Sequence, residues 1–289
     1  MSYNRQYPFT DEKFDRWTEE GRGKGTKADY LPWLSEADLP ARFGHKTRYI
    51  CAVTGRRGIA FSTTESRARL YYEAVAGVED IREQFPLDRE ITRSIAQELG
   101  IDHPRDPASR VDIVMTTDLV ISYRMSNGDL VEMPRSCKMD NKLDDFNQAE
   151  HAEIERRYWL LKKSNWRFVT NSERCMPPQL IANLTLLLQW RFPPDAAVQP
   201  FAGHFDGLCE RLVSAVLSYR GAATLAAFGA QYQADCGLGP GETVSALLHL
   251  IFRHRLRADL AGSPLMDQRV THIGAATLAR RDSSERRAA

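Results

Sequence analysis

The segment from Val111 to Lys138 constrains the fold most, because it predicts two β-strands joined by a tight turn. Asn127-Gly128 separates two β-rich runs, and Asn-Gly in that setting is the strongest short-range signal for a hairpin. The first run carries one acid, Asp118, between apolar neighbours, and the second ends on Lys138. Such a pair fits either a solvated ion pair at a sheet edge or a site that holds a divalent cation beside a phosphate.

The register of this hairpin decides between the two interpretations. If Asn127-Gly128 is a simple two-residue turn, Asp118 lies opposite Cys137, and Lys138 points to the other face of the sheet. A bulge at Pro134, which cannot donate a ladder hydrogen bond, or a three-residue loop would shift the register by one. We predict one of these two devices, and a regular ladder with Lys138 facing away would rule out a shared site.

Composition predicts a protein of the reducing cytoplasm with a packed core and no overall affinity for nucleic acid. The 289 residues are 43% hydrophobic and carry a formal net charge of +1, so any DNA partner must meet a local basic patch. The five cysteines are widely spaced and show no metal-ligand pattern, which argues against a disulfide frame or structural zinc. No apolar signal core or membrane span is expected.

The order of predicted elements from Ser62 onward indicates a fold class. Ser62 and Glu65 have the spacing of a capping box and begin a helix. A strand at 78–85, a helix at 91–99, the hairpin, a long helix at 143–163 and a strand at 166–170 follow. This is the αβββαβ order of the α/β restriction-endonuclease-like, or PD-(D/E)xK, core, in which helices flank a mixed sheet.

The remainder of the chain predicts a second, mostly helical domain. Helical patterns at 180–190, 201–217 and 244–256 are separated by Pro193-Pro194 and by a glycine-rich segment. We expect a first domain over residues 1–173, a helical domain over 174–270 and a disordered tail over 271–289. The histidines show no metal-ligand spacing and are interpreted as surface or capping groups.

Two acids in the first domain are candidate metal ligands, and each has a plainer interpretation. Glu65 could serve only as the capping-box carboxylate of its helix. Asp118 is harder to explain structurally, because a buried ionised acid is costly unless it is paired or bound to a metal. Lys138 next to a strand end is ordinarily exposed, and it gains meaning only if the fold brings it to the two acids.

Four motifs in order make the chain resemble the TnsA-type endonuclease subunits of heteromeric transposases. They are EGRGKG with DYLPWL (Glu20 to Leu34), DIREQFPL (Asp80 to Leu87), MTTD (Met115 to Asp118) and ERRYW (Glu155 to Trp159). The eight-residue DIREQFPL string is specific, whereas a lone acid followed by a lysine would be weak evidence. The resemblance covers about residues 15 to 175.

The resemblance implies a first domain that is a Mg²⁺-dependent endonuclease, with one or two ions and with Mn²⁺ as a substitute. It would nick the 5′ strands at transposon ends together with a DDE-type transposase that cuts and joins the 3′ ends. An AAA+ ATPase regulator would be a third partner, and the protein would work in the bacterial cytoplasm at the nucleoid. The second domain is implied to be winged-helix-like and to meet the ATPase and DNA.

The resemblance also assigns site residues by motif. The family's catalytic glutamate falls on Glu65, its metal-binding aspartate on Asp118 and its lysine on Lys138, with the backbone carbonyl of Cys137 as a further metal ligand. Ser136 stands where the family's glutamine is usual, so a side-chain contact to the metal or to water from this position is in doubt. Glu155 either touches water at the metal or pairs with a neighbouring arginine. Cys137 as a nucleophile is disfavoured, because no histidine lies nearby in the sequence.

DNA would be held through phosphates by basic residues in two clusters, without base-specific contacts. The candidates are Arg22, Lys24, Lys27, Arg156, Arg157 and Lys163. Two alternatives to the transposase subunit remain open at this point. One is a stand-alone restriction or repair nuclease of the same fold, and the other is a catalytically inactive DNA-binding subunit in which the Ser136 change accompanies lost metal chemistry.

Overall fold

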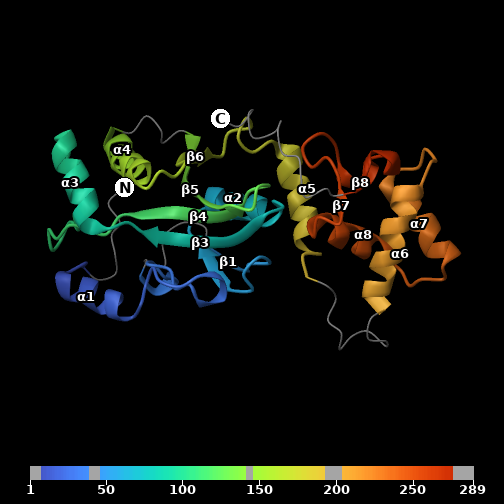
Figure 1. Ribbon diagram of the computed structural model, residues 1–289, viewed down its shortest axis with the longest axis horizontal. Coiled ribbons are helices and arrows are strands. Elements are labelled where there is room, and N and C mark those ends of the chain that lie inside the picture. The colour runs from blue at the N-terminus through green and yellow to red at the C-terminus, as the bar shows by residue number, and fades with distance from the viewer. Residues whose placement is uncertain (1–7, 39–45, 141–145, 193–203, 276–289) are drawn as a thin grey trace. The chain divides into compact units, whose positions relative to one another are not determined.

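The computed structural model describes residues 8–38, 46–140, 146–192 and 204–275 of the chain (Figure 1). The chain forms two compact units, Met1–Cys175 and Met176–Ala289. The division lies close to the boundary that the sequence predicts between residues 173 and 174. None of the described helices is long and apolar enough to cross a membrane.

A four-stranded mixed sheet forms the centre of the first unit. The strands lie in the order β3 (Val78–Pro86), β4 (Thr116–Arg124), β5 (Leu130–Lys138) and β6 (Arg167–Thr170). β4 is antiparallel to both of its neighbours, β3 and β5, whereas β6 runs parallel to β5. A parallel neighbour requires a crossover connection, which α4 (Phe146–Leu161) provides. The restriction-endonuclease-like order predicted from the sequence is therefore confirmed.

Helices cover both faces of this sheet. α3 (Arg89–Leu99) and α4 lie on one side of the strands and α1 (Asp11–Glu19) on the other (Figure 1). Val120, Ile154 and Trp159 are almost wholly buried in the core between the sheet, α3 and α4. Residues 141–145, where the long helix was predicted to begin, lie outside the described residues.

The hairpin between β4 and β5 has the shifted register that a shared site requires. Arg124 pairs with Leu130 and Val120 with Pro134, without a bulge at Pro134. The N–H of Met125 donates to the carbonyl of Asp129 at 2.8 Å, so the loop between them holds three residues, with Gly128 at φ 93°. The three-residue loop, one of the two predicted devices, is thus confirmed.

A smaller hairpin, β1 (Thr47–Ile50) and β2 (Arg57–Ala60), is fastened to α2 (Thr63–Glu73) by buried charges. Arg69 and Glu73 form an ion pair within α2, and the guanidinium of Arg69 lies 3.8 Å from the ring of Tyr49. The carboxylate of Glu73 accepts the N–H of Ala52 at 3.0 Å. These contacts hold β1 and the turn after it against α2.

The second unit is mostly helical, as predicted, and ends in a two-stranded sheet. Its elements are α5 (Pro178–Leu188), α6 (His204–Ser218), α7 (Leu225–Asp235), α8 (Glu242–Phe252), β7 (Leu256–Arg257) and β8 (Gly274–Ala275). The last three of its four helices, α6, α7 and α8, precede the antiparallel pair of β7 and β8, and the winged-helix-like assignment stays a prediction. α7 was missed in the sequence, although Thr224 caps its first turn by accepting the N–H of Ala227.

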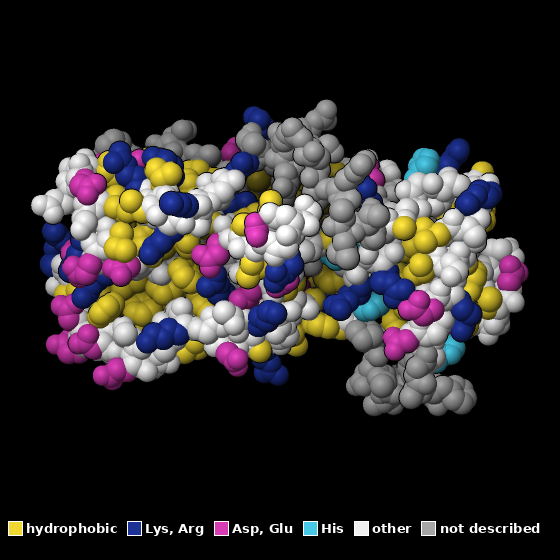
Figure 2. Space-filling model, viewed as in Figure 1, with side chains coloured by type: hydrophobic (Ala, Val, Ile, Leu, Met, Phe, Trp, Pro, Cys, Tyr) yellow, Lys and Arg dark blue, Asp and Glu magenta, His cyan; other side chains and the backbone are white. Residues whose placement is uncertain are grey.

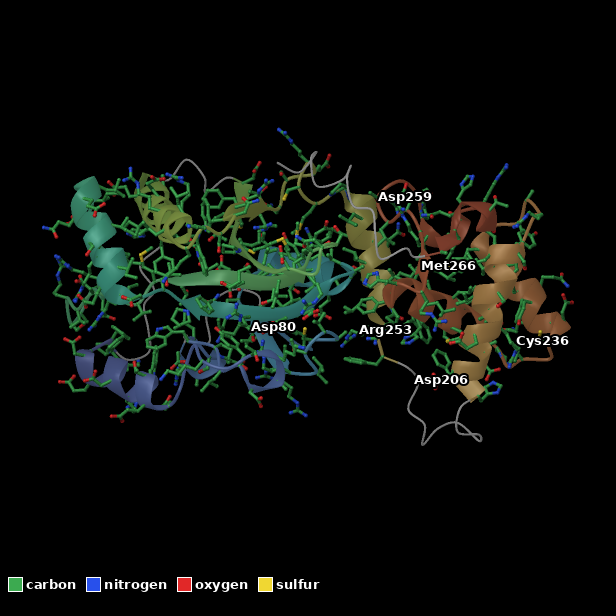
Figure 3. All side chains as sticks on the ribbon, viewed as in Figure 1. Asp80, Asp206, Cys236, Arg253, Asp259 and Met266 are labelled. Carbon is green, nitrogen blue, oxygen red and sulfur yellow. The ribbon has the colours of Figure 1, made fainter. Side chains whose placement is uncertain are left out.

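The segment that joins β7 to β8 is ordered by side-chain hydrogen bonds. Asp259, whose side chain is labelled in Figure 3, accepts the N–H groups of Ala261 at 2.9 Å and Gly262 at 3.1 Å. Residues 270–272 form a 3₁₀ turn and residues 274–275 form β8, so the prediction of a disordered tail from residue 271 begins too early. Residues 276–289 lie outside the described residues.

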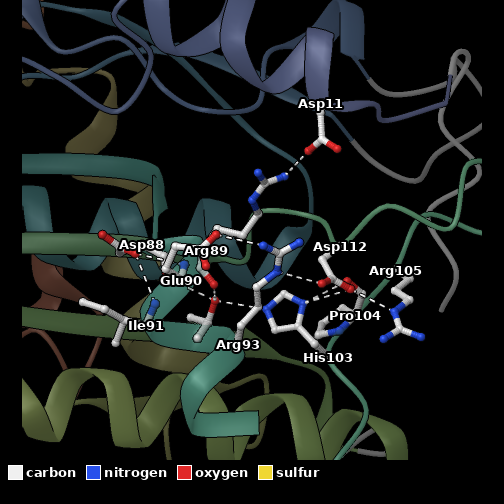
Figure 4. A network of polar contacts seen from close by, with 11 residues as sticks. Asp11, Asp88, Arg89, Glu90, Ile91, Arg93, His103, Pro104, Arg105 and Asp112 are labelled. Carbon is white, nitrogen blue, oxygen red and sulfur yellow. Dashed lines mark hydrogen bonds and ion pairs between the residues drawn. The ribbon is translucent and has the colours of Figure 1, made fainter. Parts of the chain in front are cut away.

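A polar network closes the loop after α3 against the helix (Figure 4). Asp112 accepts hydrogen bonds from Arg93 at 2.7 Å and from Arg105 at 2.9 Å. His103 is buried, with Nε2 3.0 Å from the hydroxyl of Thr92 and Nδ1 3.2 Å from the carbonyl of Pro104. The interpretation of all histidines as surface or capping groups is therefore wrong for His103. Burial lowers its pKa, although the charge of Asp112 opposes this shift.

This burial predicts an acid-sensitive contribution to stability. As the pH falls through about 6.5, the unfolded chain binds a proton that His103 in the folded chain does not hold, so the free energy of unfolding decreases. We expect an NMR titration to place the pKa of His103 below 6.5. The decrease in Tm between pH 7.5 and 5.5 should be smaller in His103→Gln than in the wild type or in His272→Gln, which alters an exposed histidine. An unshifted pKa would contradict this assignment.

Candidate active site

Glu65 is positioned by the start of α2. Ser62 accepts the N–H of Glu65 at 3.1 Å, and the Glu65 carboxylate accepts the N–H of Phe61 at 3.0 Å and the hydroxyl of Ser62 at 2.9 Å. The capping interpretation of Glu65 is therefore correct in its geometry. The side chain is buried, with only 8% of it exposed, and it lies close enough to Asp118 for the two charges to interact. Capping the helix is thus the means by which Glu65 is held beside Asp118.

Asp118 lies where the ladder between β4 and β5 stops. The last ladder pair is Leu119 with Arg135, and beyond it the carboxylate of Asp118 takes over as the link between the strands. Its Oδ2 accepts the backbone N–H of Cys137 at 2.7 Å. The register and this hydrogen bond place Asp118 beside Ser136 and Cys137, at the end of β5 that also carries Lys138.

The charges of the three predicted residues act on one another. Burial, and next the charge of Asp118, raise the pKa of Glu65 to about 8, although its hydrogen bonds with Phe61 and Ser62 and the charge of Lys138 act to lower it. Two carboxylates with little water around them repel each other, and a cation between or beside them relieves that repulsion. Asp118 and Lys138 therefore lie close enough to Glu65 for their charges to act on its carboxylate.

Cys137 lies between these residues but is not suited to nucleophilic attack. Its thiol is buried, and burial together with the charges of Asp118 and Glu65 raises its pKa well above the ordinary value. A thiol in this state stays protonated near neutral pH, and the thiolate is the reactive form. Only the backbone of Cys137 is therefore a plausible participant in chemistry.

Ser136 and Glu155 belong to a buried network between β5 and α4. The hydroxyls of Ser136 and Thr117 each donate to the Glu155 carboxylate at 2.6 Å. The indole N–H of Trp159 donates to Thr117 at 2.7 Å, and burial raises the pKa of Glu155. The alternative in which Glu155 pairs with a neighbouring arginine is wrong, since Arg156 binds Glu153 instead. With its hydroxyl donated to Glu155, Ser136 is directed toward α4 instead of toward Asp118.

Gln84 was missed by sequence reasoning. Its side-chain amide donates to Oδ1 of Asp118 at 3.3 Å and accepts the hydroxyl of Thr116 at 3.1 Å. It lies in β3 directly across from Asp118, between the pairs Glu83 with Leu119 and Phe85 with Thr117. The DIREQFPL string contains Gln84, but nothing in that string showed that this residue, among its polar members, would reach Asp118.

Of the residues predicted to contact DNA, some are paired with acidic side chains in the structure and others are exposed. Arg22 is not displayed for phosphate binding, because its guanidinium binds Asp38 at 2.7 Å and lies 4.1 Å from the ring of Trp17. Arg156 and Arg157 both bind Glu153, which lowers the pKa of that acid to about 2. Lys24, Lys27 and Lys163 are exposed. Figure 2 shows Lys and Arg scattered among Asp and Glu on the visible face, without one continuous basic surface.

The oxygen atoms at this site fit a hard divalent cation that completes its shell elsewhere. In the described part of the chain no group of three or more His, Cys, Asp or Glu residues could hold a metal ion. Mg²⁺ is commonly bound by one or two carboxylates together with water and substrate phosphates. Glu65 and Asp118 provide that number of carboxylates, and their mutual repulsion favours a cation.

The comparisons with known proteins agree with this geometry. Residues 76–171 match the model of the family described as TnsA-like endonuclease N terminal. Over 165 residues the chain is 36% identical to the transposon Tn7 transposition protein TnsA of Escherichia coli, a match that covers 57% of this chain and 59% of that protein. The match therefore spans less than two thirds of its relative. Residues 76–171, which carry Asp118 and Lys138, are thus similar to the N-terminal domain of TnsA-like endonucleases.

Proposed function

We propose that the protein is a Mg²⁺-dependent DNA endonuclease subunit of a transposase, which nicks the 5′ strands at transposon ends. A DDE-type transposase that processes the 3′ ends and an AAA+ ATPase regulator would be its partners. The observation that carries this proposal is that Asp118 and Lys138 lie close enough to Glu65 to act on its charge. Asp118 and Lys138 belong to the residues that match the TnsA-like endonuclease family, and Glu65 precedes them. The relative's printed description as a transposition protein supports the choice of DNA substrate.

The residues divide the chemistry of phosphodiester hydrolysis among them. Glu65 and Asp118, with the carbonyl of Cys137, would hold one or two Mg²⁺ ions. Bound there, Mg²⁺ supplies positive charge to the scissile phosphate and makes water a stronger acid. Lys138 orients the attacking water and offsets the negative charge that develops on the phosphate oxygens. No covalent intermediate with the protein is needed, which agrees with the protonated thiol of Cys137.

The proposed site predicts a loss of cleavage when either carboxylate is neutralised. In Asp118→Asn and Glu65→Gln we expect 5′-strand nicking of transposon-end DNA, measured with the partner transposase and Mg²⁺, to fall by at least about 100-fold. Asp129→Asn, a change at the exposed residue that follows the loop of the same hairpin, should nick at the wild-type rate. Wild-type nicking by Asp118→Asn would exclude this site. Efficient cutting of plain duplex by the protein alone would favour a stand-alone nuclease.

Metal binding at this site should stabilise the folded protein, and this stabilisation should require the same two carboxylates. A ligand that binds only the folded state stabilises it by about 2.7 kcal/mol at a concentration 100 times its Kd. We therefore expect Mg²⁺ or Mn²⁺ to raise the Tm of the wild type in thermal melts and to leave the Tm of Asp118→Asn unchanged. Chelation with EDTA should abolish nicking, and added Mg²⁺ should restore it. Nicking that persists in EDTA would contradict the metal requirement.

The exposed lysines predict a change in the salt dependence of DNA binding. Each phosphate that a basic side chain neutralises on duplex DNA contributes a slope of about −0.9 to log K against log salt concentration. If Lys27 and Lys163 each bind one phosphate, Lys27→Gln and Lys163→Gln should each make the measured slope shallower by about 0.9. Lys13→Gln, which alters a lysine that lies 4.9 Å from the ring of Trp17, is the control. An unchanged slope in both test variants would remove Lys27 and Lys163 from the DNA surface.

A further inference from the structure

We propose that Gln84 is a positioning residue that fixes the carboxylate of Asp118 in the orientation needed to bind the metal. This inference rests on the proposed function, since it takes Asp118 as a metal ligand. It concerns the side-chain amide of Gln84 and the unusual backbone conformation that delivers it. Neither the TnsA-like family match nor the motif that contains Gln84 gives this residue a role.

The backbone of Gln84 is the first observation. Five non-glycine residues of the described chain have a positive φ, and Gln84, at 48°, is the one among them that lies inside a β-strand. The left-handed region is unfavourable for a residue with a Cβ atom, and such strain tends to occur at functional sites. The carbonyl of Gln84 accepts the N–H of Trp33 at 3.2 Å, which helps to hold this conformation.

The conformation also reverses the alternation of side chains along β3. Residues three apart in a regular strand point to opposite faces. The guanidinium of Arg82 nevertheless lies 4.9 Å from the ring of Phe85, and Phe85 in turn packs 5.7 Å from Trp159. The turned backbone therefore has a packing role of its own. Any test must separate that role from the role of the amide.

The amide of Gln84 is oriented by its two partners. A carboxylate accepts hydrogen bonds, whereas the hydroxyl of Thr116 can donate one, so Nε2 must face Asp118 and Oε1 must face Thr116. Asp118 then receives one N–H on each oxygen, from Gln84 on Oδ1 and from Cys137 on Oδ2. Gln84 itself is 4% exposed, so water does not compete for these contacts.

Two donors on one carboxylate fix its plane while they leave a second lone pair on each oxygen for a cation. The donor from Cys137 is a backbone group that no side-chain change removes. Of the two donors to Asp118, the amide of Gln84 is therefore the one that a substitution can remove. Groups that orient a metal ligand in this way typically alter metal affinity by about 10- to 100-fold when they are removed.

The test measures Mn²⁺ binding to the full chain without DNA, by electron paramagnetic resonance of the free ion. Gln84→Gly keeps the left-handed backbone available and removes the amide, and Gln84→Asn keeps an amide that is one methylene too short. We expect the Kd for Mn²⁺ to rise about 10- to 100-fold in both variants. The Tm of Gln84→Gly should stay close to that of the wild type, because relief of the positive φ offsets part of the loss of the two hydrogen bonds of the amide. Gln97→Asn, on the exposed face of α3, is the matched control.

Two further readouts separate the possible failures. Asp118→Asn should lose Mn²⁺ binding; if it binds as the wild type does, the proposed metal site is wrong. If Asp118→Asn loses binding while either Gln84 variant stays within twofold of the wild-type Kd, the positioning role alone is wrong. In nicking assays, a high Mg²⁺ concentration should restore most of the rate of Gln84→Gly and none of the rate of Asp118→Asn. A rate that high Mg²⁺ does not restore in Gln84→Gly would also overturn the positioning role.

Discussion

The hydrogen bond from the backbone N–H of Cys137 to the carboxylate of Asp118 is the interaction on which the site depends. It forms where the ladder between β4 and β5 has ended, so a side chain replaces a backbone carbonyl as the link between the strands. A strand N–H that has no ladder partner must find another acceptor if it is buried. The same bond that satisfies this N–H therefore holds an ionisable acid at the edge of the core. The link between the strand ends and the position of the Asp118 carboxylate thus depend on the same hydrogen bond, so a change in one also changes the other.

The order of elements and the cap of α2 could be predicted from the sequence, because both depend on local patterns. Ser62 and Glu65 form their predicted hydrogen bonds, and the hairpin has one of the two predicted register-shifting devices, the three-residue loop. α7 was missed because its composition gives no clear apolar stripe. It is recognised only by Thr224 at its start.

The rest of the site depends on tertiary contacts that no local pattern contains. The left-handed backbone of Gln84 is stabilised by Trp33, a residue from a different segment of the chain, so no propensity for glutamine could indicate it. Arg22 seemed a DNA contact because it stands among glycines and lysines, yet the fold places Asp38 and Trp17 around it. A basic residue near the site is available for DNA phosphate only when the fold does not already pair it with an acidic or aromatic side chain.

Ser136, at the position where a glutamine is expected from the resemblance, affects which oxygen ligands the site can offer a metal. The side chain is short, 1% exposed and already donates to Glu155, so it adds no ligand beside Asp118. In return it joins β5 to α4 through a carboxylate that also receives a hydrogen bond from Thr117. This connection fixes α4 against the strand end that presents Lys138. With two carboxylates and a backbone carbonyl as protein ligands, the proposed metal must draw its remaining oxygen ligands from water and DNA phosphate. On that view, metal binding and substrate binding reinforce each other, because each supplies charge that the other lacks.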